Sequence, residues 1–361
     1  MLRIEMLPAR NGDALWIEYG DAASPRRIIV DGGTEGSFED GLRARIGSLP
    51  ADERRFELLV VTHVDSDHIA GVLELVRDDA LGATYGDVWF NAWRHLPATV
   101  EELGPVEGEL LTQAILEREL KWNEAFDGDA VVIPNEGELP RVELAGGLEI
   151  TVLGPRLEEL AELRPRWLEA VVAAGLDPEV PIVERPEPPP SGLETLGTTP
   201  DVAALAASAF KEDTAEANGS SIVLLLEHDG TSALLTGDAF PSVVLAGVTR
   251  LLAERDAERL ALDAFKVPHH GSRANLSPAL LGALECSRHL FSSNGTNTKH
   301  PHPESVARTI EATGPGSTLH FNYSTRFNEA WAQDELEEQH EYEALYPDDG
   351  ATGLTVTLGD D

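Results

Sequence analysis

A single loop limits what this chain can fold into more than any other stretch. The run His63-Val64-Asp65-Ser66-Asp67-His68 places four side chains that can bind a divalent cation within six residues. The apolar run 58–61 before it predicts a buried strand, and the apolar spacing from Ile69 onward predicts a helix. The loop is therefore expected at the C-terminal end of a strand, where α/β proteins usually place their chemistry.

The spacing inside this loop can bring its ligands together. Alternate side chains of an extended segment point the same way, so His63, Asp65 and Asp67 can converge, and His68 turns back as the helix begins. Imidazole and carboxylate groups suit zinc, manganese or iron, and two such pairs suit two metal ions. The alternative is a polar loop that caps a helix with Asp67, but a cap needs one carboxylate rather than four ligands.

Three other apolar strands are expected to end in residues of the same kinds. Asp238 ends one, His269 and His270 end a second, and His300 and His302 follow a third. A carboxylate at the end of a buried strand is costly unless it is paired or bound to metal. Four strand ends that carry His or Asp predict one site built from separate segments.

Weaker candidates lie near the same strand ends. Asn91 and His95 follow a strand predicted over 87–91, and each could be a weak ligand, a substrate contact or a structural residue. Ser272 and the backbone after Gly271 could hold a phosphate oxygen or only pack the turn. For all of these, the sequence leaves both roles open.

Short turns predict how the strands connect. Asn11-Gly12-Asp13, Gly146-Gly147 and His228-Asp229-Gly230 each separate two apolar runs, as the loops of β-hairpins do. Asp31, at another strand end, could orient a metal ligand or form a turn. Residues 130–133 also have the apolar character of a strand.

The chain changes character between two regular halves, 1–155 and 220–361, which we expect to form a single domain. The segment 156–219 contains a predicted helix over 156–173, a proline-rich run that excludes regular structure, and a second helix over 201–211. We interpret it as an insertion, either a lid over the site or a surface excursion.

Charge and composition limit the partners. The net charge is −37 and only four lysines are present, so a basic surface for long duplex DNA is not expected, whereas a small or single-stranded anion is compatible with a cationic metal site. One cysteine, Cys286, fits a reducing compartment. No apolar run approaches the roughly 20 residues needed to cross a bilayer, and the first residues do not resemble a signal peptide. We expect a cytoplasmic protein with no membrane partner, and the oligomeric state stays open.

Taken together, the motifs resemble the metallo-β-lactamase superfamily. The resemblance rests on the 63–68 loop, on Thr236-Gly237-Asp238 and on Pro268-His269-His270-Gly271-Ser272. Within the superfamily, Asn11-Gly12-Asp13 and His300-Pro301-His302-Pro303 are similar to the soluble hydrolase domain of the competence protein ComEC and its free-standing relatives. The likeness spans both halves and leaves the 156–219 segment unexplained.

This resemblance implies an α/β fold, a four-layer αβ/βα sandwich, with two divalent metal ions, Zn or Mn, at one edge of its two sheets. Carried over residue by residue, His63 and Asp65 would bind one ion, and Asp67 and His68 the other. Asp238 would bridge both ions and His269 would complete the second position. His270 would be a further ligand or a substrate contact.

Two departures from the family pattern affect the metal. Asp65 stands where many members have histidine, and Leu153-Gly154-Pro155 stands where many have a further histidine. One ion would therefore have more oxygen ligands, which makes manganese a credible occupant and argues against a true β-lactamase. Asn91, His95 or water would fill the gap.

The predicted function is that of a metal-dependent hydrolase, with phosphodiesterase or nuclease activity favoured. A metal-bridging hydroxide would attack single-stranded nucleic acid or a small nucleotide, with Asp67 orienting the water. Lys299, His300 and His302 would bring positive charge or proton donors to the anionic leaving group. The alternatives are a lactonase- or amidase-like carbonyl hydrolase and a non-catalytic metal-binding partner module.

Overall fold

The computed structural model describes residues 1–96, 106–163, 199–296 and 298–359. Two β-sheets form its centre. The first sheet has, in spatial order, β18 (Leu354–Leu358), β1 (Leu2–Met6), β2 (Leu15–Tyr19), β3 (Arg26–Val30), β5 (Leu58–Val61) and β7 (Val88–Phe90). The second has β17 (Tyr342–Leu345), β16 (Ser317–Phe321), β15 (Arg288–Phe291), β13 (Ala264–Lys266), β11 (Thr231–Leu235), β10 (Val223–His228), β9 (Leu148–Gly154) and β8 (Arg141–Leu144).

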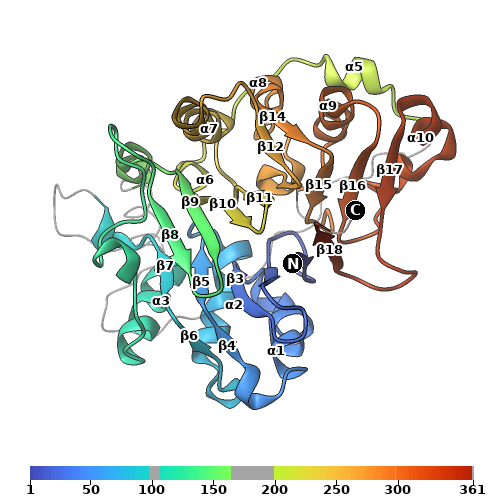
Figure 1. Ribbon diagram of the computed structural model, residues 1–361. Coiled ribbons are helices and arrows are strands. Elements are labelled where there is room, and N and C mark those ends of the chain that lie inside the picture. The colour runs from blue at the N-terminus through green and yellow to red at the C-terminus, as the bar shows by residue number, and fades with distance from the viewer. Residues whose placement is uncertain (97–105, 164–198, 297, 360–361) are drawn as a thin grey trace.

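Helices cover the outer faces of the two sheets. The N-terminal half contributes α1 (Ala44–Gly47), α2 (Ser66–Arg77) and α3 (Val106–Glu117), and the C-terminal half contributes α7 (Pro241–Arg255), α8 (Pro278–Ala283), α9 (Pro303–Thr313) and α10 (Asp334–His340). In Figure 1 the first group lies at the bottom, the second along the top, and the sheets between them. This is the four-layer α/β arrangement that the sequence predicts.

The alternation of side chains explains how the first sheet separates two cores. Ile28 and Val30 of β3 face the second sheet and share a core with Leu224 and Leu234 of that sheet. Ile29, which lies between them in the strand, belongs to the other core, beneath α2 and α3. A strand with apolar side chains on both faces must be covered on both sides, which is why the sheet is sandwiched.

Short elements complete the chain. Two-stranded sheets pair β4 (Arg55–Phe56) with β6 (Thr84–Tyr85), and β12 (Leu260–Leu262) with β14 (Leu284–Cys286). Before β10 lie α5 (Val202–Ala206) and α6 (Glu216–Gly219). In the described part of the chain, no helix is long and apolar enough to cross a membrane.

The three predicted hairpins are confirmed. Antiparallel pairs join β1 to β2, β8 to β9 and β10 to β11 across the expected turns. The strand predicted over 130–133 is wrong: only Ile133 forms an isolated bridge, because the amide of Val131 bonds to the side chain of Asn91 instead of a neighbouring strand. The helix predicted over 201–211 is shorter, and that over 156–173 is seen at 157–163, the rest of it lying outside the described residues.

Candidate metal centre

Three segments meet at the C-terminal ends of β5, β11 and β13. His63 and Asp65 follow β5, and Asp67 and His68 lie in the first turn of α2. Asp238 follows β11 and is 2% exposed. The residue at the cap position of α2 is Asp65, which makes no side-chain capping hydrogen bond, whereas Asp67, the cap considered from the sequence, lies inside the first turn.

The carboxylate of Asp238 is the point on which four histidines converge. Its Oδ1 lies 3.2 Å from His68 Nε2, and its Oδ2 lies 3.5 Å from His270 Nε2, 3.6 Å from His269 Nε2 and 3.9 Å from His63 Nε2. Atoms bound to one tetrahedral zinc ion at about 2.0 Å lie about 3.3 Å apart. The spacing around Asp238 therefore fits shared metal ions.

One group of ligand atoms is compact and lies beside Asp238. The Nε2 atoms of His68 and His270 are 3.3 Å apart, and His270 Nε2 is 3.6 Å from Asp67 Oδ2. Asp67 is held by Asn11, whose Nδ2 donates to Oδ2 over 2.9 Å. Two imidazole lone pairs this close repel unless a proton or a cation lies between them, so the group fits a divalent ion.

The other group, His63 and Asp65 at the first metal position, is more open. His63 Nε2 lies 3.6 Å from Asp65 Oδ2, and it is buried without a hydrogen-bond partner among the described residues, as is Asp238 Oδ1. Asp65 is half-exposed, so this side of the site faces solvent. A buried, unbonded imidazole nitrogen facing two carboxylates fits a set of metal ligands.

Asp31 fixes the tautomers of two of these histidines. Its carboxylate accepts hydrogen bonds from the backbone N and Oγ1 of Thr62, and lies 2.8 Å from His68 Nδ1. Because Thr62 gives its hydroxyl proton to Asp31, the 3.0 Å contact between Thr62 Oγ1 and His63 Nδ1 requires His63 to donate. Both rings therefore present Nε2 lone pairs to the site, as metal ligands do.

A buried ion pair performs the same task for His270. Asp13 Oδ1 lies 3.3 Å from His270 Nδ1, and Asp13 Oδ2 accepts a 2.8 Å hydrogen bond from Lys266 Nζ. Asp13 lies within the same tight group as His68, Asp238 and His270. It faces the far edge of the His270 ring and is neutralised by lysine, so we assign it to orientation rather than to metal binding.

Sequence reasoning missed Asp13 and Lys266 as parts of the site. The signal was present, because Lys266 interrupts the apolar run Ala264–Val267. A lysine in a buried strand must have a partner, and only the fold shows that this partner is Asp13 in the turn after β1. The link joins the two sheets directly behind the site.

His269 and His270 both reach Asp238 because of an unusual backbone. Their φ angles are 49° and 55°, in the left-handed region that non-glycine residues rarely adopt. Neighbouring side chains of an extended strand would point to opposite faces, whereas here both rings face the carboxylate. The sequence left open which of His269 and His270 binds metal, and the distances group His270 with Asp67 and His68.

The charges of this cluster depend on one another. Burial disfavours the ionised Asp238, but His68, His270 and His269 outweigh burial and hold the pKa of this carboxyl well below its usual range. Burial also disfavours charged imidazoles, yet Asp238 and Asp31 raise the pKa of His68 well above its usual value. Asp238 and Asp13 likewise raise the pKa of His270 to about 9. The cluster attracts positive charge, as a cation site must.

The predicted substrate residues lie around the cluster. The buried His300 ring is 5.1 Å from that of His269 and 6.1 Å from that of His270, and burial, followed by these two rings, holds its pKa well below the usual value. His302 Nδ1 accepts from the backbone of Arg273, and Lys299 is partly exposed. Ser272 Oγ accepts from Ala274 N, so this hydroxyl packs its own turn.

Asn91 and His95 make structural bonds elsewhere. The amide of Asn91 donates to Val131 O and accepts from Val131 N. His95 Nδ1 accepts from Ala92 N, and its ring packs edge-on against Trp122. The idea that either residue fills the gap in the ligand set or contacts substrate finds no support in these bonds.

The fold gives no metal ligand at Gly154, in the segment where many family members have a further histidine. Leu153 is buried in the core, and a Cβ on Gly154 would meet Val243 and Val223. An added side chain there would therefore point into apolar surroundings rather than to a metal. Among the described residues, His269 is the nearest imidazole to Asp238 that the compact group does not use.

Comparisons with known proteins identify the family of the chain. A family model described as the metallo-beta-lactamase superfamily matches residues 10–286. CmlA, a diiron beta-hydroxylase from Streptomyces venezuelae, aligns at 13% identity and a TM-score of 0.41 over 99% of this chain; this chain spans about half (54%) of the CmlA chain. Human tRNase Z, short form, aligns at 9% identity and a TM-score of 0.41 over 100% of both chains. No curated protein sequence matches significantly.

Proposed function

The chain belongs to the metallo-beta-lactamase superfamily, and we propose that it is a metal-dependent phosphodiesterase that cleaves single-stranded nucleic acid or a small nucleotide. The observation that carries this proposal is the convergence of four imidazoles on the buried Asp238, with Asp65 and Asp67 beside them. Such a donor set suits two divalent cations. The motif likeness to the ComEC-type hydrolase domain supports a phosphodiester substrate.

The ligand residues follow from the two groups. Asp67, His68 and His270 would hold one ion and His63 and Asp65 the other, with Asp238 between them. Bound divalent cations supply Lewis acidity and lower the pKa of a water nucleophile. The protein holds each ring in its ligating tautomer through Asp31, Thr62 and Asp13, so no ligand has to reorganise when substrate arrives.

The oxygen-rich side of the site bears on the identity of the metal. Asp65 gives the first position a carboxylate beside a single imidazole of the loop, His63. Carboxylate ligands suit manganese, and imidazole ligands suit zinc. We therefore propose Mn²⁺ or Zn²⁺ as the physiological ion, with the first position the more tolerant of manganese.

The surroundings of the site favour an anionic substrate. His300 stays neutral because its pKa is depressed, so it keeps an N–H to donate to a phosphoryl oxygen or a leaving group. His302 and Lys299 follow in the same loop. The chain as a whole carries a charge of −37, which repels a long polyanion. A single strand or a nucleotide that reaches only the cationic centre fits both observations.

We also propose that 1–155 and 220–361 form one domain, with 156–219 inserted between them. Apolar residues of both halves share one core, which supports this division. The role of the insertion as a lid over the site stays a prediction, since residues 164–198 lie outside the described chain.

Hydrolysis by the metal-loaded protein tests the proposed activity. We expect chelator-treated protein to be inactive and Mn²⁺ or Zn²⁺ to restore cleavage of bis-p-nitrophenyl phosphate and of short single-stranded oligonucleotides, faster than of the matched duplex. Asp238→Asn should abolish this turnover, and Asp263→Asn, on the same sheet but outside the site, should preserve it. Cleavage of lactones or amides without any phosphodiester hydrolysis would contradict the proposal.

A further inference from the structure

We propose that His269 completes the first metal position, beside His63 and Asp65, and that Asp213 holds its imidazole in the ligating orientation. This inference rests on the proposed metal centre but not on the bond that the enzyme hydrolyses. It also makes a residue between the two halves of the chain part of the centre.

The second position has a set of ligands without His269. Asp67, His68, His270 and Asp238 already offer it four ligand atoms, which is the full set of a tetrahedral ion. In the described chain, His270 makes an ion-pair contact with Asp67 whereas His269 makes none, so His269 lies away from that carboxylate. Both rings approach Asp238 Oδ2, at 3.5 Å for His270 Nε2 and 3.6 Å for His269 Nε2, so the contact with Asp67 is what separates their roles.

The first position is short of a ligand. His63 and Asp65 contribute one atom each, and Asp238 Oδ2 is the third. That same oxygen is 3.6 Å from His269 Nε2, which is closer than the 3.9 Å to His63 Nε2. An ion bound to Oδ2 would therefore have the imidazoles of His63 and His269 at similar distances from that oxygen.

The ring of His269 is fixed in the tautomer that a ligand needs. Its Nδ1 lies 2.9 Å from Asn275 Oδ1 and 3.5 Å from Asp213 Oδ2, both hydrogen-bond acceptors. Asn218 Nδ2 is also 3.3 Å from this nitrogen, but it donates over the shorter 2.6 Å to Asp213 Oδ2. The proton therefore sits on Nδ1, and the lone pair of Nε2 faces Asp238. This parallels the way Asp31 and Asp13 serve His68 and His270, so all four imidazoles of the cluster have an oxygen behind them.

Asp213 is itself held in place. Its Oδ2 accepts from Asn218 Nδ2 over 2.6 Å and from Asn275 Nδ2 over 3.0 Å, and its backbone N donates to Ala274 O. Asn275 Nδ2 also donates to the backbone oxygen of Asp238. Asp213, Asn218 and Asn275 thus form a bonded cradle that ties the segment before β10 to His269 and to the Asp238 backbone.

Metal titration assigns His269 to a position. Protein freed of metal with a chelator is loaded with Co²⁺. The number of bound ions is measured by elemental analysis together with the visible absorption of the cobalt. Wild type should bind two ions. His269→Gln should weaken one ion at least tenfold, Asp213→Ala should weaken the same ion about 10- to 100-fold, and Asp213→Asn, which keeps an acceptor oxygen, should weaken it less.

Double variants separate the two positions. If His269 and Asp65 serve the same ion, Asp65→Ala/His269→Gln still binds one ion tightly, whereas Asp65→Ala/His270→Gln binds none. Glu212→Gln is the matched control, since Glu212 neighbours Asp213 but accepts from Ser242 N instead, and it should keep both ions. Thermal unfolding of the metal-free proteins verifies that each variant is folded.

Three outcomes would overturn the inference: two ions bound with wild-type affinity in His269→Gln, loss of both ions in Asp65→Ala/His269→Gln, or unchanged affinity in Asp213→Ala. A protein that binds both ions as expected but hydrolyses no phosphodiester would refute the proposed function and leave this assignment intact.

Discussion

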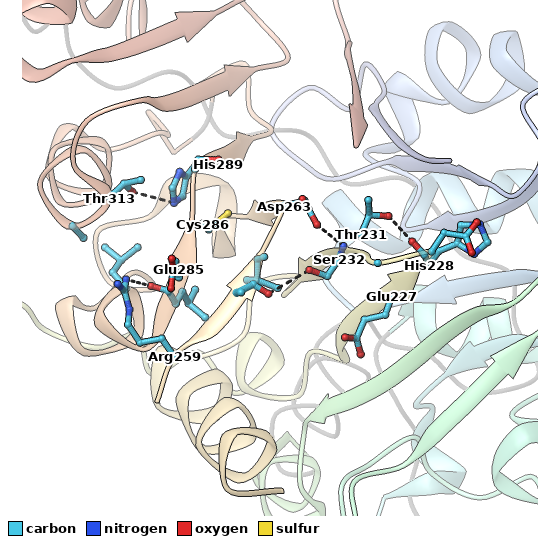
Figure 2. Close-up of a pocket in the computed structure, with 18 of the residues that line it drawn as sticks. Glu227, His228, Thr231, Ser232, Arg259, Asp263, Glu285, Cys286, His289 and Thr313 are labelled. Atoms are coloured by element: carbon cyan, nitrogen blue, oxygen red, sulfur yellow. Dashed lines mark hydrogen bonds and ion pairs between the residues drawn. The ribbon is translucent and has the colours of Figure 1, made fainter. Parts of the chain in front are cut away.

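The two ends of the second sheet carry the same kinds of residues but differ in what those residues face. At the C-terminal ends of β11 and β13, histidines converge on Asp238. At the opposite end, Asp263, Cys286, His289 and their neighbours line a cavity of about 850 Å³. Figure 2 shows that these polar groups bond to local partners: His289 to Thr313 and Asp263 to the backbone of Ser232.

This difference shows that a functional site depends on side chains that converge on one point rather than on the presence of a cavity. In the cavity, burial lowers the pKa of His289 to about 3 and raises that of the Cys286 thiol to about 12, so both groups stay neutral. In the metal-free centre the carboxylates outweigh burial and raise the pKa values of His68 and His270. We therefore place the chemistry at Asp238 rather than in the cavity.

The largest expected effect comes from the two aspartates at the opposite ends. Asp238→Asn should lose both metal ions and lower turnover by at least about 10³-fold, because each ion loses a ligand and its strongest charge. Asp263→Asn should keep two ions and most of the activity. Elemental analysis and phosphodiester assays of both variants measure this. Loss of metal from Asp263→Asn, or retention of both ions by Asp238→Asn, would contradict the placement of the metal centre at Asp238.

The buried Asp13–Lys266 pair should give the largest effect on stability. Lys266→Met leaves Asp13 buried without its partner, which should lower the free energy of unfolding by about 3–5 kcal/mol. Urea denaturation of the chelated protein measures this. The double variant Asp13→Leu/Lys266→Met should recover much of the stability but bind metal more weakly, because His270 loses its orienting carboxylate. Equal metal affinity in the double variant would rule out that role of Asp13.

The pH dependence of stability should have opposite signs at the two ends. In the metal-free protein, the raised pKa of His270 adds stability that is complete below about pH 6.5 and is lost as pH rises through 9. The lowered pKa of His289 has the reverse effect: stability is complete above about 6.5 and falls as pH drops toward 3.

Urea midpoints between pH 4 and 9.5 measure these two contributions. His270→Gln should flatten the alkaline limb, and His289→Gln should flatten the acidic limb, each unit of pKa shift corresponding to about 1.4 kcal/mol. If both variants keep the wild-type slopes on both limbs, the pKa values of His270 and His289 are not shifted by folding as proposed.

The smallest effect is expected at Cys286. Its raised thiol pKa predicts slow reaction with a thiol reagent at pH 8 in the native protein and fast reaction in denaturant. Cys286→Ala should change phosphodiester turnover less than twofold. A fast native reaction, or a large loss of activity on modification, would indicate that the cavity end has chemistry of its own.

Local patterns predicted much of the fold. The continuous apolar run of β5 predicted a buried strand, and the turns at Gly12, Gly146 and Gly230 predicted the three hairpins. The strand predicted over 130–133 does not form, because an apolar run cannot show whether its backbone will bond to a strand or to a side chain such as that of Asn91. The return of β18 to pair with β1 joins residues more than 300 positions apart, which no local pattern encodes.

The sequence by itself determined the ligand types and the strand ends that carry them, because residue chemistry and side-chain period are local properties. Only the tertiary structure decided which atoms face one another. The left-handed backbone at His269 and His270 turns two adjacent rings toward one carboxylate, and Asp13, Asp31 and Asp213 reach their histidines from distant segments. Orientation depends on contacts between segments that only folding brings together, so the division of the 63–68 loop's ligands between two positions could not be settled from the loop alone.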